Sequence, residues 1–244
     1  MKHGIFLIVL LFSFAVIAKS QQSANAYNDS MLTMLLKGIP KSKQEAFKKT
    51  YNAMPDDNKR IYEAFALPIS SKKELISNID SSYNNIEEAI KYFTEITGAG
   101  FDLYIEFNPP QKILHKGESV DFWCSTIDSS GSAPLFQEWN LELTSSKLDS
   151  LLQQVNWDRM KLTKLKAALQ KANCISIKNG SPIEVGFARS GMGKYSYLIF
   201  EKDLNATQIK QYNDGCSYIF YKNNIVLEYG GGAVGSQCFP YEEE

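Results

Sequence analysis

Residues 93 to 107 read FTEITGAGFDLYIEF, and the spacing of the apolar residues changes within this stretch. Before Gly98 the apolar side chains recur at every third or fourth residue, as they do on one face of a helix. After Gly100 they alternate with polar residues, which indicates a half-buried strand. We therefore expect a long helix to end at Gly98 and a strand to begin at Phe101.

The region upstream of this change is predicted to be helical from Met31 to Thr97. Ser71 and Glu74 fit a capping box, in which the serine and the glutamate satisfy free backbone donors at the start of a helix. A second capping box, Ser42 to Glu45, is expected to open an earlier helix. Three prolines divide the region into short helices. They are Pro40, Pro55 and Pro68.

The helix that follows Ser71 carries one continuous apolar stripe of six residues. They are Ile76, Ile79, Tyr83, Ile86, Ile90 and Phe93. Such a stripe must be buried against another surface. We expect it to pack on the protein's own core, and the alternative is a surface that docks on a partner.

Downstream of Gly100, runs of strands surround one helical stretch. The first strands are predicted at 101–107, 119–127 and 135–143, the helical stretch at 148–172, and five further strands at 175–178, 183–188, 194–201, 216–221 and 225–229. Asn156 to Asp158 is a candidate break within the helical stretch. Runs of strands, rather than strict alternation with helices, predict an α+β fold with a mainly antiparallel sheet. The expected order is an α-rich region packed on or preceding the sheet, then βββ, α and βββββ.

The N-terminal stretch is predicted to be a cleaved signal peptide. Lys2 precedes a 14-residue, mostly apolar run from Ile5 to Ala18, which is shorter than the roughly 20 residues of a membrane helix. The alternative is an uncleaved membrane anchor. We divide the chain into a signal peptide (1–20), a helical region (21–98), an α+β domain (101–240) and an acidic tail (241–244). The expected product has no integral membrane span and is secreted or periplasmic.

The four cysteines, Cys124, Cys174, Cys216 and Cys238, all lie downstream of the predicted signal peptide. An even number of cysteines in an exported chain predicts two disulfide bonds. The segments around Cys216 and Cys238 resemble two arms of a hairpin, so we expect these two to pair. Cys124 and Cys174 would then form the second bond. A catalytic free thiol is the alternative.

The composition excludes several classes of function. The 26 Lys and Arg residues against 27 Asp and Glu residues leave no basic surface for nucleic acid. His115 is the one histidine outside the predicted signal peptide, so a metal site with two histidine ligands is excluded. We expect no metal and no cofactor. Gly230 to Gly235 matches a dinucleotide-binding pattern, but the nine residues that follow are too few for the required helix.

Large aromatic side chains crowd the predicted strands, and they are our candidate binding residues. They are Trp123, Trp139, Tyr195, Tyr197, Tyr218, Tyr221 and Tyr229. Tyrosine and tryptophan are common at recognition surfaces, although they also fill cores. The leading hypothesis is an exported, disulfide-bonded binding or interaction module without catalytic activity. Its expected partner is an extracytoplasmic protein, peptide or glycan.

Two other functions remain open. A secreted hydrolase would use a pair of carboxylates on the strands, or a cysteine or serine with His115. The candidate carboxylates are Asp102, Glu106, Asp121, Glu138, Glu142, Glu184, Glu201 and Glu228. An accessory component of an envelope assembly would instead use the apolar stripe as its docking face.

Overall fold

The computed structural model describes residues 30–37, 39, 41–110, 117–128, 131–233 and 237–239. The predicted signal peptide, His115 and the acidic tail lie outside the described residues. The chain divides into two compact units, Met1–Glu63 and Ala64–Glu244. The long helix upstream of Gly98 therefore belongs to the same unit as the sheet.

The first unit contains α2 (Lys41–Ala53) and most of α3 (Asp56–Ala66). Tyr51 is buried, and its hydroxyl donates a hydrogen bond to the buried carboxylate of Glu63. This bond joins the two helices. Ser42 lies inside α2 and therefore does not cap it, in contrast to the capping box expected there.

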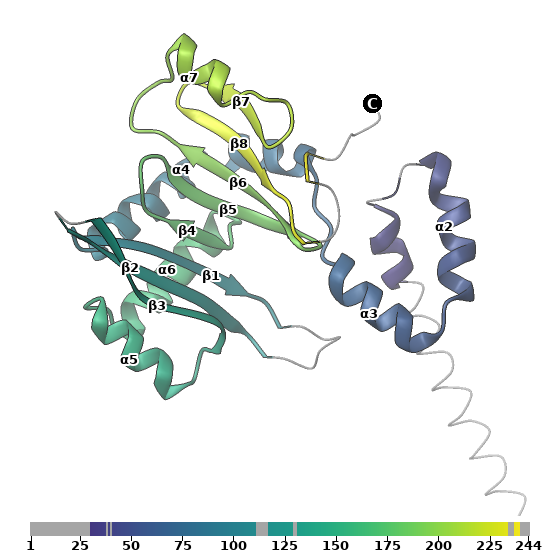
Figure 1. Ribbon diagram of the computed structural model, residues 1–244, viewed down its shortest axis with the longest axis horizontal. Coiled ribbons are helices and arrows are strands. Elements are labelled where there is room, and N and C mark those ends of the chain that lie inside the picture. Colours follow the sequence, from purple (N-terminus) through teal and green to yellow (C-terminus); the bar gives the residue numbers. More distant parts are fainter. Residues whose placement is uncertain are drawn as a thin grey trace, which may run out of the picture. The chain divides into compact units, whose positions relative to one another are not determined.

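The second unit combines an eight-stranded sheet with helices (Figure 1). The helices are α4 (Lys72–Ile96), α5 (Ser146–Gln154), α6 (Arg159–Lys171) and α7 (Ala206–Gln211). The strands are β1 (Phe101–Asn108), β2 (Ser119–Asp128), β3 (Gly131–Glu142), β4 (Ser176–Lys178), β5 (Ile183–Ser190), β6 (Gly193–Ile199), β7 (Tyr218–Lys222) and β8 (Ile225–Gly230). Their order in the sheet is β3-β2-β1-β4-β5-β6-β8-β7, and all neighbours are antiparallel. The predicted α+β class is confirmed.

Helix α4 begins at the capping box expected at Ser71. The Ser71 hydroxyl accepts from the backbone N–H of Glu74, and the Glu74 carboxylate accepts from the backbone N–H of Ser71, both at 3.1 Å. Ile79, Ile86 and Phe93 of the apolar stripe are fully buried in the core of the second unit. The stripe thus packs intramolecularly, which leaves the envelope-assembly hypothesis without its docking face.

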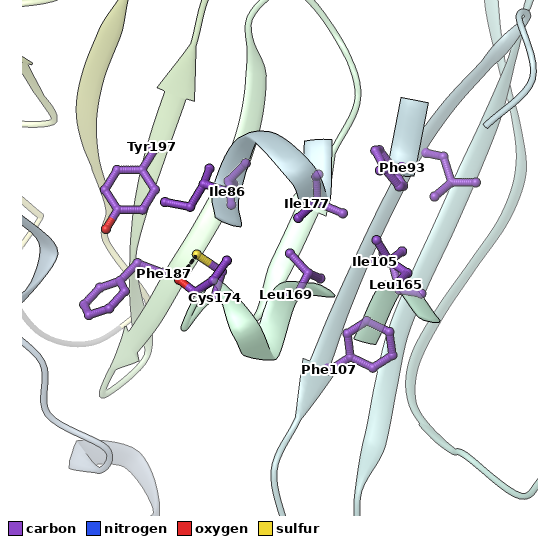
Figure 2. Close-up of a cluster of buried hydrophobic side chains, with 14 of the residues drawn as sticks. Ile86, Phe93, Ile105, Phe107, Leu165, Leu169, Cys174, Ile177, Phe187 and Tyr197 are labelled. Atoms are coloured by element: carbon purple, nitrogen blue, oxygen red, sulfur yellow. Dashed lines mark hydrogen bonds between the residues drawn. The ribbon is translucent and has the colours of Figure 1, made fainter. Parts of the chain in front are cut away.

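The main core lies between α4, α6 and one face of the sheet. Figure 2 shows Leu165 and Leu169 of α6 beside Ile105 of β1 and Ile177 of β4. All four side chains are at most 1% exposed. Each such side chain contributes about 1.5–3 kcal/mol of burial free energy, so this layer is the main source of stability in the second unit.

The predicted break between two helices is confirmed at residues 156–158. Asn156 has a φ of 57°, a left-handed conformation that asparagine tolerates better than most residues. Asp158 then caps α6, because its carboxylate accepts from the backbone N–H of Lys161 at 2.7 Å. The turn lets α5 and α6 pack on the sheet in different directions.

The Cys216–Cys238 disulfide is present, as predicted. It holds the segment that carries Phe239 against the body of the second unit. The ring of Phe239 is 5.8 Å from the rings of both Tyr195 and Tyr229, and it is buried with them in the core. The disulfide therefore fixes the last described part of the chain to the core.

The predicted Cys124–Cys174 disulfide is wrong, because both thiols are free and buried. Cys124 lies opposite Leu103 of β1. Cys174 lies next to Ile175, whose carbonyl accepts from Phe107 at the other end of β1. Four residues of a strand span about 13 Å, and the two cysteines are also on opposite sides of β1. A disulfide tolerates a Cα separation of only about 7 Å.

Candidate functional site

The side chains that point away from α4 and α6 form what we call the second face of the sheet. On β1, Leu103 and Ile105 point into the main core, so Tyr104 and Glu106 point to the second face. Near β7, the second face is covered by a small apolar cluster around Leu204 at the start of the α7 region. On the other strands several of the side chains on this face are polar, and Glu106, Asp121, Ser176 and Ser196 among them are buried.

Seven residues, each directly opposite the next, cross the second face as a polar row. From β2 to β7 they are Asp121, Glu106, Ser176, Gly186, Ser196, Glu228 and Tyr218. Adjacent strands are about 4.8 Å apart, so the row follows the sheet for roughly 29 Å. A sheet face with this composition is suited to hydrogen bonding rather than to packing.

Glu106 is the most deeply buried charge of the polar row. It is fully buried, and Arg189 donates to its two oxygens from Nε at 2.6 Å and from Nη2 at 2.8 Å. The hydroxyl of Tyr104 also donates to this carboxylate. A buried carboxylate needs such a paired and hydrogen-bonded environment, and the bidentate arrangement fixes its orientation.

Asp121 occupies the β2 end of the polar row, opposite an irregularity in β3. Its carboxylate accepts from the side chain of Asn108 at 3.0 Å and from the backbone N–H of Asn140 at 2.7 Å. Asn140 has a φ of 54°, and the bulge at this position leaves Trp139 52% exposed. Burial raises the pKa of Asp121 even though both hydrogen bonds oppose the change.

Lys194 contacts side chains of both β5 and β1 on the second face. Its Nζ lies 2.7 Å from the carboxylate of Glu184 and 4.8 Å from the ring centre of Tyr104. The hydroxyl of Ser196 donates to the same Glu184 carboxylate at 3.2 Å. Although burial acts in the opposite direction, the charge and hydrogen bond of Lys194 lower the pKa of Glu184, with help from Ser196.

Glu228 differs from its neighbour Glu184 in its state of ionisation. Burial, together with the negative charge of Glu184, raises the pKa of Glu228 to about 7. The charge of Lys194 and a hydrogen bond with Tyr218 partly offset this rise. The pKa of Glu228 therefore lies near neutral pH, while the pKa of Glu184 lies below its ordinary value.

The centre of the polar row is formed by two small residues. The hydroxyl of Ser176 is fully buried and has no hydrogen-bond partner among the described residues. A Cβ on Gly186 would lie 2.0 Å from this hydroxyl and 3.3 Å from Cδ of Lys194, so a larger residue does not fit. An unsatisfied buried hydroxyl costs about 1–3 kcal/mol, so Ser176 is a locally unfavourable group at the centre of the row.

The seven aromatic candidates do not form one surface. Tyr195, Tyr197 and Tyr229 lie in the main core, where Tyr197 donates to the carbonyl of Leu75 at 2.8 Å. Their side chains are at most 5% exposed, so they serve as core residues. Tyr221 bonds to Asp80 of α4 and also lies away from the second face.

The remaining three candidates, Trp123, Trp139 and Tyr218, line or border the second face. Trp123 is half-buried and stacks on Tyr104, with 5.8 Å between the ring centres and 21° between the planes. Lys178 lies 4.9 Å from the Trp123 ring. The aromatic groups are thus concentrated at the β1–β3 end of the polar row.

The structure brings several of the candidate carboxylates onto the second face, among them Asp102, which lies 3.9 Å from Nζ of Lys178. Four others lie on or beside the polar row. These are Glu106, Asp121, Glu184 and Glu228. The sequence reasoning missed Lys194, Arg189 and Ser176, because their roles depend on strands that are distant in the chain. The alternation of polar residues within each strand was the available signal, and it does not show which strands are neighbours.

The two free thiols do not have the character of nucleophiles. Burial raises the pKa of Cys124 to about 11 and that of Cys174 to about 12, so both remain protonated at neutral pH. The hypothesis of a cysteine or serine acting with His115 falls outside the described residues. Within the described part of the chain, no group of three or more His, Cys, Asp or Glu side chains is placed to hold a metal ion.

Comparison with models of protein families, with curated proteins and with solved structures finds no match to this chain. Among the helices that the structure describes, none has the length and the apolar character needed to cross a membrane. A function must therefore be argued from the second face itself.

Proposed function

We propose that this protein is an exported binding module that holds a glycan on the second face of its sheet. The observation that carries the proposal is the position of exposed and half-buried indole rings beside the polar row. Trp139 is 52% exposed, and it borders the end of the row at which Trp123 and Asp121 lie.

A glycan matches this combination of groups. A sugar ring presents apolar C–H groups on its faces and hydroxyls around its edge, so an indole ring and a neighbouring carboxylate each have a partner. The centres of protein–protein interfaces are depleted in charged residues. The partly exposed charged side chains Arg189 and Glu184 therefore favour a hydroxyl-rich ligand over a protein partner.

Substitution of the indole rings tests the binding site. Trp139→Ala and Trp123→Ala are each expected to weaken glycan binding at least tenfold, which corresponds to about 1.4 kcal/mol. Isothermal titration calorimetry against a panel of soluble oligosaccharides and polysaccharides measures the loss. Tyr221→Phe, which removes a hydroxyl on the other side of the sheet, is the matched control. Binding that is unaffected in both tryptophan variants would exclude the second face.

Intrinsic fluorescence gives an independent measurement. The chain has three tryptophans, and Trp157 is 3% exposed within the main core. A ligand on the second face should protect Trp139 from a quencher such as iodide and should leave the signal of Trp157 unchanged. Equal quenching with and without the glycan argues against the proposed surface.

The export part of the proposal has its own support and its own test. The predicted signal peptide (1–20) and the Cys216–Cys238 disulfide are both typical of a protein that folds outside the cytoplasm. Intact-mass measurement of the protein from its native host should show a chain that lacks residues 1–20. Recovery of the protein only with these residues intact would contradict cleavage.

A further inference from the structure

The asparagine that follows β4 is held by the backbone of β1. Oδ1 of Asn179 accepts from the backbone N–H of Leu103 at 2.6 Å, and Nδ2 of Asn179 donates to the carbonyl of Phe101 at 2.6 Å. The backbone N–H of Asn179 also donates to the carbonyl of Leu103 at 3.2 Å. The side-chain amide therefore acts as a further peptide group in the pairing of β1 with β4, which has three residue pairs of its own.

Asn179 precedes Gly180, and the two form the only Asn–Gly pair in the sequence. Because glycine has no Cβ, its backbone nitrogen approaches the side-chain carbon of a preceding asparagine with little steric hindrance. This approach is the first step in the loss of ammonia from asparagine. In the folded protein, the two hydrogen bonds to β1 hold the Asn179 amide in one orientation and oppose that step.

We propose that Asn179 is a site of spontaneous deamidation that reacts when β4 separates locally from β1. Separation frees the side-chain amide, and the backbone nitrogen of Gly180 attacks Cγ of Asn179. The bond from Cγ to Nδ2 breaks, and ammonia leaves with the proton that the Gly180 nitrogen loses. Water then opens the five-membered succinimide ring, adding a hydroxyl to one carbonyl carbon and a proton to the nitrogen. The product is an aspartate or an isoaspartate.

The product of this reaction does not fit the original pairing. Both oxygens of a carboxylate are acceptors, so the carbonyl of Phe101 loses its donor and faces a negative charge. An isoaspartate also adds one carbon to the backbone between β4 and β5. The reaction therefore converts a transient separation of β4 from β1 into a permanent weakening of their pairing.

This weakening acts on the candidate binding site through Lys178. Lys178 precedes Asn179, lies directly opposite Tyr104 of β1 and has its Nζ 4.9 Å from the ring centre of Trp123. A looser β4 therefore changes the position of a side chain that borders the indole ring. The hydrogen bonds of Asn179 support the modification whatever the ligand of the second face is.

Peptide mapping by mass spectrometry tests the modification in the wild-type protein. Folded protein and protein unfolded in urea are incubated at mildly alkaline pH, and the fraction of Asn179 converted to aspartate or isoaspartate is followed. The unfolded chain should react at least tenfold faster, because folding holds the amide against β1. Equal rates, or an unfolded chain in which Asn179 is stable, would overturn the proposal.

The dependence on urea separates local from global unfolding. Local separation of β4 exposes little surface, so the rate in the folded protein should not change at low urea concentrations. A rate that rises in proportion to the equilibrium constant for global unfolding would refute the role of the pairing of β1 with β4.

Asn179→Asp reproduces the aspartate product and measures its effect on stability. This variant should raise the equilibrium constant for unfolding in urea at least tenfold. The matched control is Asn205→Asp, because the side-chain oxygen of Asn205 caps α7 by accepting from two backbone N–H groups, as a carboxylate also does. Wild-type protein that has deamidated at Asn179, separated by ion exchange, gives the same comparison if the variant does not fold. Product-like protein as stable as Asn205→Asp would show that the aspartate fits the pairing, and would refute the lasting effect.

Discussion

At the level of single residues, Glu228 makes the stability of the protein depend on pH. Its pKa is raised to about 7 in the folded protein, whereas an unperturbed glutamate titrates near 4.3. Between these two values the folded protein holds a proton that the unfolded chain has released. The free energy of unfolding must therefore fall as the pH rises through this window.

The Glu228→Gln variant should lose this dependence. The contribution of the wild-type residue is fully present below about pH 4 and is lost as the pH rises through about 7, by about 4 kcal/mol in total. Urea unfolding at about pH 5 and about pH 8 measures the difference, with Glu138→Gln as the control. Identical slopes in wild type and Glu228→Gln would show that Glu228 is not protonated in the folded state.

Gly186 is the second residue with a measurable individual role. Because a Cβ at this position would lie 2.0 Å from the hydroxyl of Ser176, Gly186→Ala should destabilise the protein by about 1–3 kcal/mol through overpacking. In a Ser176→Ala background the clash with the hydroxyl is absent, so the cost should be smaller. A double-mutant cycle of chemical unfolding measures this coupling. Additive effects would mean that the two side chains do not meet.

At the level of helices and strands, the local signals in the sequence located the elements well. The glycines at 98 and 100 mark the end of α4 and the start of β1, because a change of period follows directly from local geometry. The capping box at Ser71 is likewise a local feature. The box at Ser42 was wrong because α2 begins one residue earlier, so the serine is already part of the helix.

The candidate site was much harder to predict than the elements. Glu106 and Ser176 are separated by about 70 residues, and only the pairing of β1 with β4 makes them neighbours. Because β4 pairs with β1, β1 also lies between Cys124 on β2 and Cys174 next to β4, and the two cysteines are too far apart to bond. The alternation of residues along β1 showed that Tyr104 and Glu106 share a face of the sheet. It does not show that Arg189 and Lys194 contact them on that face.

The capping box of α4 should contribute measurably to stability. Ser71→Ala removes the side-chain acceptor for the backbone N–H of Glu74, and it should destabilise the protein by about 1 kcal/mol. Ser81→Ala in the same helix removes a hydroxyl that bonds back to the carbonyl of Ser77 and should be nearly neutral. Thermal or urea unfolding compares the two variants. A Ser71→Ala protein as stable as Ser81→Ala would show that the cap is dispensable.

For the molecule as a whole, the Cys216–Cys238 disulfide joins the end of the described chain to the sheet. The bond spans 22 residues of sequence, for which the loss of chain entropy in the unfolded state predicts about 3 kcal/mol of stabilisation. Cys238→Ser should lose this amount and should also release Phe239 from its contacts with Tyr195 and Tyr229.

Urea unfolding with and without a reducing agent measures the effect of the disulfide. Wild-type protein under reducing conditions should match Cys238→Ser, and the reducing agent should not change the variant. Cys174 and Cys124 are free in the oxidised protein, so labelling of denatured, unreduced protein should modify two thiols. Labelling of four thiols, or of none, would contradict this arrangement.

The pairing of β1 with β4 divides the large sheet into two parts that are weakly joined. This seam has three residue pairs, as does the pairing of β4 with β5, whereas β1 and β2 share eight. Such a short ladder is a place for local opening, in which amide hydrogens bonded across it, such as that of Phe107 to the carbonyl of Ile175, exchange with solvent before those of either part. Two side-chain interactions cross the seam and strengthen it. They are the Glu106–Arg189 ion pair and the hydrogen bond between Lys194 and Tyr104. A ligand bound across the polar row would therefore stabilise the pairing of β1 with β4. Amide hydrogens at the seam should then exchange more slowly in the presence of a tighter ligand.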